Sequence, residues 1–165
     1  MRVYLPGTVR TLRTLMDTGE LGPPPLTGFA VTPGLREWYT DDDVDELEYQ
    51  ALVEAARGSL RLLDDDRTAA RRRVVISAEV PDSAVTPRPD LDRAVVRVGI
   101  PVPMRLVASV HVDGPEAEPA IRAAAAATLE AELGSEEAKF LMDEAEGHEL
   151  LWYATQEVPI LLELF

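Results

Sequence analysis

The sequence contains no cysteine and a single lysine, Lys139. Without cysteine the chain can form no disulfide scaffold, no thiolate zinc site and no cysteine nucleophile. With one lysine and neither a Gly-x-x-x-x-Gly-Lys nor a Ser-x-x-Lys motif, it lacks the ammonium group that phosphate-loop and lactamase-type chemistry requires. The turn after the first strand-like segment carries only Gly7, and no Gly-x-Ser-x-Gly motif occurs, so neither dinucleotide binding nor a hydrolase nucleophile is indicated. We therefore expect no cofactor.

Positive charge and long apolar runs are also scarce. Sixteen Lys and Arg residues against 30 Asp and Glu residues give a net charge of −14, which repels nucleic-acid phosphates and anionic membranes. No apolar run approaches the about 18 residues of a membrane span, and no basic segment followed by an apolar one precedes the strand-like run at Val3. We expect a soluble cytoplasmic protein that binds neither nucleic acid nor membranes. Its candidate partners are a basic protein or further copies of itself in a homo-oligomer.

The length of 165 residues and the hydrophobic content of 46% fit a single domain, 1–165, with its own core. Short apolar and β-branched runs predict strands at residues 3–5, 29–31, 74–80, 94–98, 107–112 and 150–154. Apolar residues at helical spacing predict helices at residues 9–16, 35–39, 40–63, 120–133, 136–146 and 155–165. Residues 81–92 carry three prolines and predict a mobile loop. This order favours an α/β fold with a single mixed sheet and helices packed on it, with α+β as the alternative.

Two of these elements carry specific expectations. The longest helix is predicted to start at Thr40, followed by Asp41, Asp42 and Asp43, because a hydroxyl caps a helix and carboxylates favour its positive end. The last strand has apolar side chains on both faces, and we expect it inside the sheet, covered on both sides, with Trp152 in the core.

Six short blocks of sequence are distinctive in combination. They are MRVYLP at 1–6, FAVTP at 29–33, ELEY at 46–49, VHVD at 110–113, HELLWY at 148–153 and QEVP at 156–159. Together they resemble an uncharacterised actinobacterial family of small acidic proteins, a domain of unknown function. The resemblance spans nearly the whole chain and implies no reaction, cofactor or catalytic residue. The strong preference for Arg over Lys is typical of a GC-rich actinobacterial genome.

The block at 110–113 holds the best candidates for chemistry. His111 and Asp113 alternate at the end of a predicted strand, so both point to one face just before a helix, where α/β sheets place their sites. A purely structural interpretation stands beside this one, in which Asp113 caps the helix and His111 donates to a backbone carbonyl. His148, with Glu144 and Glu149 close in sequence, could complete a zinc or manganese set. No metal motif accompanies these residues, and we expect no metal.

Two further sets of residues are weaker candidates. Ser109 or Thr155 could act as a nucleophile beside a His/Asp pair, although such residues occur by chance in any chain of this size. Trp38, Trp152 and Tyr153 could form an interaction surface, because aromatic side chains dominate binding hot spots.

The missing catalytic motifs favour a non-enzymatic protein-interaction or regulatory domain over an enzyme. The alanine-rich helix and the negative charge concentrated in residues 41–70 and 114–165 support that interpretation, since acidic helices can dock a basic partner. The alternative is a small-ligand-binding protein or enzyme that uses a site at His111 and Asp113. A pocket that joins these two residues to His148 would favour the alternative, and a flat surface there would favour interaction.

Overall fold

The computed structural model describes residues 1–39 and 43–165. Its strands are β1 (Arg2–Gly7), β2 (Glu20–Leu21), β3 (Leu26–Phe29), β4 (Val74–Glu79), β5 (Val85–Pro87), β6 (Val95–Val98), β7 (Val102–Pro103), β8 (Val107–Val112) and β9 (Leu151–Tyr153). Its helices are α1 (Val9–Thr18), α2 (Pro33–Trp38), α3 (Val44–Asp65), α4 (Glu118–Ala126), α5 (Thr128–Glu132), α6 (Glu136–Glu146) and α7 (Val158–Leu162). Four 3-10 turns lie at Asp82–Ala84, Met104–Leu106, Pro115–Ala117 and Thr155–Glu157.

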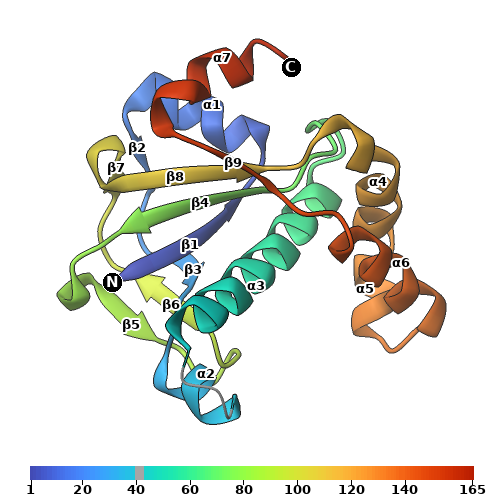
Figure 1. Cartoon of the computed structure of the whole chain (residues 1–165), viewed down its shortest axis with the longest axis horizontal. Coiled ribbons are helices and arrows are strands. Elements are labelled where there is room, and N and C mark those ends of the chain that lie inside the picture. Colours follow the sequence, from blue (N-terminus) through green and yellow to red (C-terminus); the bar gives the residue numbers. More distant parts are fainter. Residues whose placement is uncertain (40–42) are drawn as a thin grey trace.

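A seven-stranded sheet in the order β5-β6-β3-β1-β4-β8-β9 forms the centre of the molecule (Figure 1). The predicted α/β fold, with one main sheet and helices packed on it, is confirmed. Every strand pair in the described residues is antiparallel, so the sheet lacks the parallel neighbours that a mixed sheet would have. Strands β3 and β4, which are connected through α2 and α3, run parallel to each other. They are not neighbours in the sheet, because β1 lies between them and pairs antiparallel with both.

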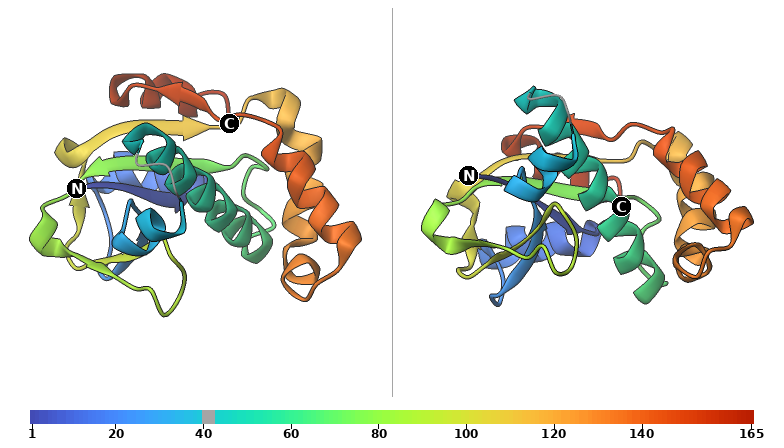
Figure 2. Two further views of the ribbon diagram at one scale, coloured as in Figure 1. Left: turned by 60° about the horizontal axis from the view of Figure 1, so that its bottom comes forward. Right: turned by 90° about the horizontal axis from the view of Figure 1, so that it is seen from below.

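Each face of the sheet packs against different helices (Figures 1 and 2). One face carries α3, whose apolar stripe joins sheet residues in a cluster that includes Tyr4, Phe29, Leu47, Ala51 and Val75. The opposite face carries α1 and α7, whose buried side chains join the inward side chains of β1, β4 and β8. The helices α4, α5 and α6 form a separate lobe beside one end of the sheet.

Local sequence explains where α1 ends and where α3 begins. Helix α1 stops at Gly19, which adopts a left-handed conformation with φ of 81° and donates its backbone N–H to the Leu15 carbonyl. Helix α3 starts after Asp43, whose side chain accepts from the Asp45 N–H. The predicted start at Thr40, Asp41 and Asp42 lies outside the described residues.

The C-terminal strand differs from its prediction. Instead of lying inside the sheet, β9 forms its edge and pairs only with β8 among the described strands. Leu151 is 44% exposed and Trp152 61% exposed, so the expected burial of the indole is wrong. In the helix that follows, the predicted apolar stripe of Val158, Leu161, Leu162 and Phe165 packs against the α1 face, with the first three buried and Phe165 partly buried. The α-helix is shorter than the predicted 155–165 and spans Val158–Leu162, after a 3-10 turn.

Two other segments are more structured or more divided than expected. Residues 81–92 contain a 3-10 turn and β5, which pairs with β6, while the mobility of this segment stays a prediction. The predicted helix at 120–133 is divided at Ala127 into α4 and α5. There the Ala127 N–H bonds to the Ala124 carbonyl in a tighter turn, and Thr128 Oγ1 donates to the same carbonyl.

Candidate functional site

Asp113 follows β8 and forms a buried ion pair with Arg73, the residue before β4. Its Oδ2 accepts from the Arg73 backbone N–H at 2.8 Å and from Nε at 2.8 Å, and its Oδ1 accepts from Nη2 at 2.7 Å. The two side chains are 0% and 3% exposed. Arg73 Nη2 also donates to the His148 carbonyl oxygen at 2.6 Å. Asp113 therefore neither caps the following helix nor faces a substrate, because its carboxylate is occupied by Arg73.

His111 lies on the α3 face of the sheet, away from this ion pair. Its Nε2 is 3.1 Å from Ser77 Oγ and 3.4 Å from Ser109 Oγ. Burial, and secondarily the positive charge of Arg2, lowers the pKa of His111 below its ordinary value of 6.5, so the imidazole is neutral at neutral pH. The structure thus places hydroxyl groups beside the ring where a backbone carbonyl was predicted.

These positions do not assemble a Ser-His-Asp triad. Ser77 is 0% exposed and Ser109 4% exposed, so neither hydroxyl is open to a substrate. Thr155 lies in a 3-10 turn, where its Oγ1 bonds to the Gln156 side chain. A triad also needs a carboxylate on the imidazole, and Asp113 is bound to Arg73 instead.

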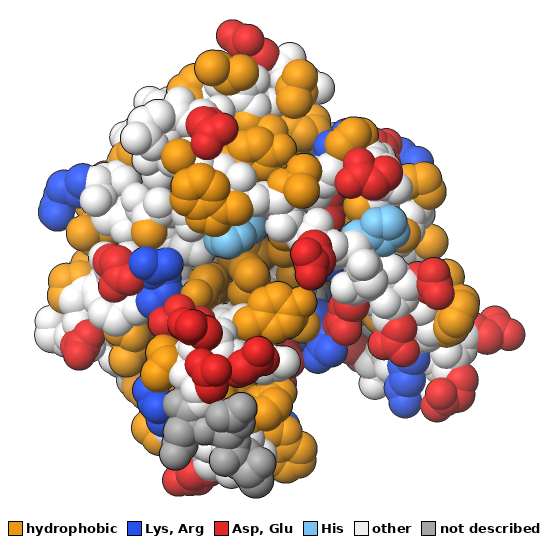
Figure 3. Space-filling model, viewed as in Figure 1, with side chains coloured by type: hydrophobic (Ala, Val, Ile, Leu, Met, Phe, Trp, Pro, Cys, Tyr) orange, Lys and Arg blue, Asp and Glu red, His pale blue; other side chains and the backbone are white. Residues whose placement is uncertain are grey.

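His148 borders a pocket between α3 and the segment that leads from α6 to β9. The pocket has a volume of about 140 Å³. Its lining residues, which define what we call the α3 pocket, are Tyr49, Leu52, Val53, Ala56, Arg57, Leu60, Arg73, Glu146, His148, Glu149 and Leu150. Neither His111 nor Asp113 is among them. Figure 3 shows this face of the molecule, with hydrophobic side chains visible in a hollow near its centre.

The pocket exists because α3 covers only part of the sheet face. Helix α3 packs mainly over β1, β3 and β4. Leu150 packs at the edge of the same cluster as Leu52, which gives the gap its apolar walls. The remaining space is open at the surface.

Around the α3 pocket both arginines have ion-pair partners, whereas one carboxylate has none among the described residues. Arg57 forms ion pairs with Glu146 and, at 3.1 Å, with Glu54, and burial raises the pKa of the Glu54 carboxyl. Arg73 is neutralised by Asp113. Glu149 is exposed, and the structure assigns it no ion pair with any described residue. The charged residues that line the pocket balance, and the arginine partners Glu54 and Asp113 make its surroundings net negative.

The three aromatic candidates are not brought together. Trp38 lies on α2, 60% exposed, with the Arg93 guanidinium 3.4 Å from the centroid of its ring. Trp152 lies on the α3 face at the β9 edge, where it is paired with His111 across the strands. Tyr153 is half-buried and packs on the opposite face, in the cluster of α1 and α7.

Residues 1–162 match a family described as a family of unknown function, DUF6912. The chain belongs to this family. No curated protein and no solved structure matches the chain. The resemblance to a family of unknown function is confirmed, whereas actinobacterial origin stays a prediction. Membership of DUF6912 brings no activity with it, so function must be argued from the site.

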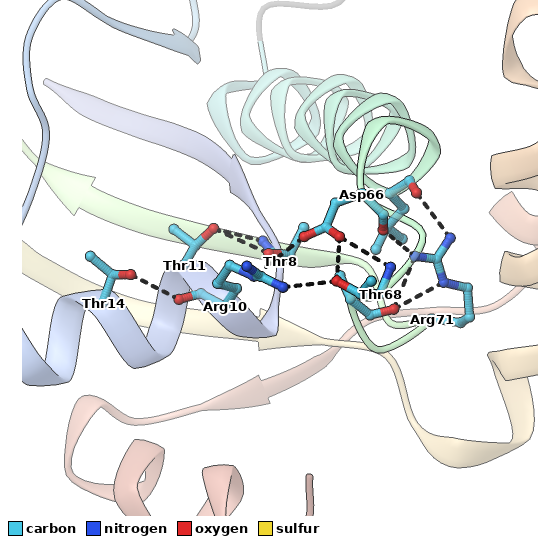
Figure 4. A network of polar contacts seen from close by, with 9 residues as sticks. Thr8, Arg10, Thr11, Thr14, Asp66, Thr68 and Arg71 are labelled. Carbon is cyan, nitrogen blue, oxygen red and sulfur yellow. Dashed lines mark hydrogen bonds and ion pairs between the residues drawn. The ribbon is translucent and has the colours of Figure 1, made fainter.

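This DUF6912 member has a second polar cluster, between the start of α1 and the turn after α3 (Figure 4). Arg10 Nη2 donates to Thr68 Oγ1 at 2.8 Å, and Arg10 Nε lies 3.3 Å from Asp66 Oδ2. Thr68 Oγ1 donates to Asp66 Oδ1 at 2.6 Å, and Thr8 donates its backbone N–H to Thr11 Oγ1 at 2.9 Å. These groups satisfy one another, and the cluster joins α1 to the 66–71 turn.

The described residues of this DUF6912 member offer neither a cluster of metal ligands nor a membrane-spanning helix. Residues 1–39 and 43–165 contain no group of three or more His, Asp or Glu side chains that could hold a metal ion. In the same ranges no helix is long and apolar enough to cross a membrane. The His111, Asp113 and His148 side chains are thus not gathered around one metal position.

Proposed function

We propose that this protein is a non-enzymatic interaction domain that binds a basic segment of a partner protein at the α3 pocket. One apolar side chain of the partner enters the pocket, and a neighbouring Arg or Lys pairs with Glu149. The observation that carries the proposal is an apolar pocket whose own cations are already neutralised and whose rim keeps an exposed carboxylate.

The size of the pocket supports a side chain as its occupant. Sites for metabolites and cofactors usually measure about 300 to 1,000 Å³. The α3 pocket holds about 140 Å³. An engineered apolar cavity of about 150 Å³ binds one benzene molecule, which is the scale of one Leu or Phe side chain.

Charge supports a basic partner. Arg57 and Arg73 are held by carboxylates of this chain and cannot readily recruit an acidic ligand. The whole chain carries −14, which accelerates encounter with a positively charged protein and repels an acidic one.

The alternative of an enzyme or small-ligand site at His111 and Asp113 has less support. Asp113 is 1% exposed and committed to Arg73, and the hydroxyls beside His111 are buried. A catalytic base and nucleophile must reach a substrate, and these groups do not line the α3 pocket.

The proposal is tested by titrating the ¹⁵N-labelled chain with capped five-residue peptides and following backbone amide shifts. The probe is Arg-Ala-Leu-Ala-Arg, and the controls are Arg-Ala-Ala-Ala-Arg, which lacks the apolar anchor, and Glu-Ala-Leu-Ala-Glu, which reverses the charge. We expect saturable shifts around Leu52, Ala56 and Leu150 with the probe alone. Shifts of equal size with all three peptides, shifts confined to other surfaces, or no shifts at millimolar peptide would contradict the proposal.

A further inference from the structure

The two edges of the main sheet are built differently. The β5 edge ends at Pro87, which has no N–H to donate, and the charged pair Arg88 and Asp90 follows it directly. Proline and charge are common protections of an edge strand against pairing with another chain. Residues 150–155 at the β9 edge contain no proline and no charged side chain, and the one carboxylate that binds backbone there is that of Glu157, which accepts from the Ala154 N–H at 3.0 Å beyond the end of β9.

The β9 strand offers both backbone and apolar side chains for pairing. In an antiparallel pair, alternate N–H and C=O groups point away from the neighbouring strand, here β8. Trp152 is 61% exposed on the α3 face, and Leu151 is 44% exposed on the other. Such an edge is a template for another strand.

The helix that follows β9 extends the same apolar surface. Helix α7 buries Val158, Leu161 and Leu162 but leaves Ile160 69% exposed, and Leu164, which follows the helix, is 77% exposed. In Figure 1 α7 lies at the top of the molecule next to β9, and Figure 3 shows hydrophobic side chains gathered over that rim. Monomers seldom leave such a patch beside an open strand edge.

We infer that β9 pairs with β9 of a second copy of this chain, antiparallel and centred on Trp152. The two indoles then face each other on the α3 side of a sheet that continues through both copies. Leu151 lies opposite Tyr153 of the second copy, and Leu150 lies opposite Ala154. Aromatic and aliphatic cross-strand pairs of this kind stabilise antiparallel sheets.

The register also keeps like charges apart, which is why a second copy fits despite its charge of −14. Glu149 lies opposite Thr155 of the second copy, and Glu157 lies opposite Gly147. No carboxylate therefore meets another directly across the paired strands. The three-residue strand β9, with Leu151 and Trp152 exposed on it and Ile160 and Leu164 exposed beyond it, is small beside the about 800 Å² per partner of a standard interface. The dimer is therefore reversible and concentration-dependent.

The test is sedimentation velocity on the full chain from low micromolar to near millimolar concentration, at low and at high salt. We expect a monomer–dimer equilibrium that shifts toward the dimer as salt rises, because salt screens the repulsion between two acidic copies. Peptide binding at the α3 pocket should instead weaken as the salt concentration rises. A failure of the dimer proposal can therefore be distinguished from a failure of the peptide-binding proposal. Hydrogen exchange at the amides of β9 should slow as the dimer forms.

A pair of lysine substitutions locates the interface. Trp152→Lys places two lysines face to face and should raise the dimer dissociation constant at least about tenfold. Phe140→Lys is the matched control, because Phe140 is an aromatic side chain on α6 that is also 61% exposed, and it should leave the dimer unchanged. Thermal unfolding checks that both variants fold. A chain that stays monomeric at every concentration overturns the inference. So does a dimer that Trp152→Lys leaves intact, or one in which β9 exchange is independent of concentration.

Discussion

At the scale of single residues, Arg73 and Asp113 hold the start of β4 to the end of β8. Water is excluded from both side chains, and every polar contact of the carboxylate comes from Arg73. Removing one member of such a pair leaves the other charge buried without compensation. The pair also positions the α3 pocket, because Arg73 binds the His148 carbonyl.

We expect Asp113→Ala to lower the free energy of unfolding by about 3 to 5 kcal/mol, since it leaves the Arg73 guanidinium uncompensated. Urea unfolding followed by tryptophan fluorescence measures the loss. The control is Glu132→Ala, which removes the partner of Arg61 from an exposed pair and should change stability little. If Asp113→Ala does not fold, Asp113→Asn keeps the shape of the side chain and should give a smaller, measurable loss. Equal effects of Asp113→Ala and Glu132→Ala would refute this role.

The sequence identified Asp113, His111 and, beside His111, Ser109, but it did not identify the partners Arg73 and Ser77. Alternation along a strand is local, so it placed both side chains correctly on one face of β8. Arg73 is 40 residues away from Asp113, and its contact depends on the register between β4 and β8. An arginine directly before a strand that is buried over Val74–Ala78 is the signal that was available, because a charge that enters a buried strand needs a partner.

At the scale of elements, the C-terminal segment shows which patterns report burial. The spacing of Val158, Leu161 and Leu162 predicted the buried stripe of α7, because helical periodicity distinguishes a buried side from an exposed one. The run at 150–153 gave no such distinction. A strand that is apolar on both faces reads the same whether it lies inside a sheet or at an edge that awaits another strand.

Neighbouring residues of α7 provide a matched test of its packing. Leu161→Ala should lower the free energy of unfolding by about 2 to 5 kcal/mol, because the side chain is 4% exposed in the cluster shared with α1. Ile160→Ala, at a position 69% exposed, should change it by no more than about 0.5 kcal/mol. Measurements belong at a protein concentration where the chain is monomeric. Similar losses from the two variants would mean that α7 does not pack as described.

At the scale of the whole molecule, charge and the incomplete cover of the sheet act together. Helix α3 packs mainly over β1, β3 and β4, and the α3 pocket lies between this helix and the segment that leads to β9. Composition alone predicted an acidic surface suited to a basic partner. It could not locate the pocket, because Leu52 and Leu150 approach each other only through the order of strands in the sheet.

The measurement that tests the central claim most directly is the affinity of the Arg-Ala-Leu-Ala-Arg peptide for two charge-reversed variants. Glu149→Arg and Glu137→Arg change the net charge equally, but only Glu149 lines the α3 pocket. Binding at the pocket predicts that Glu149→Arg weakens the peptide at least about tenfold, while Glu137→Arg has only the small effect of a distant charge. Equal losses from the two variants would show that the peptide senses only the overall charge and would contradict a binding site at the α3 pocket.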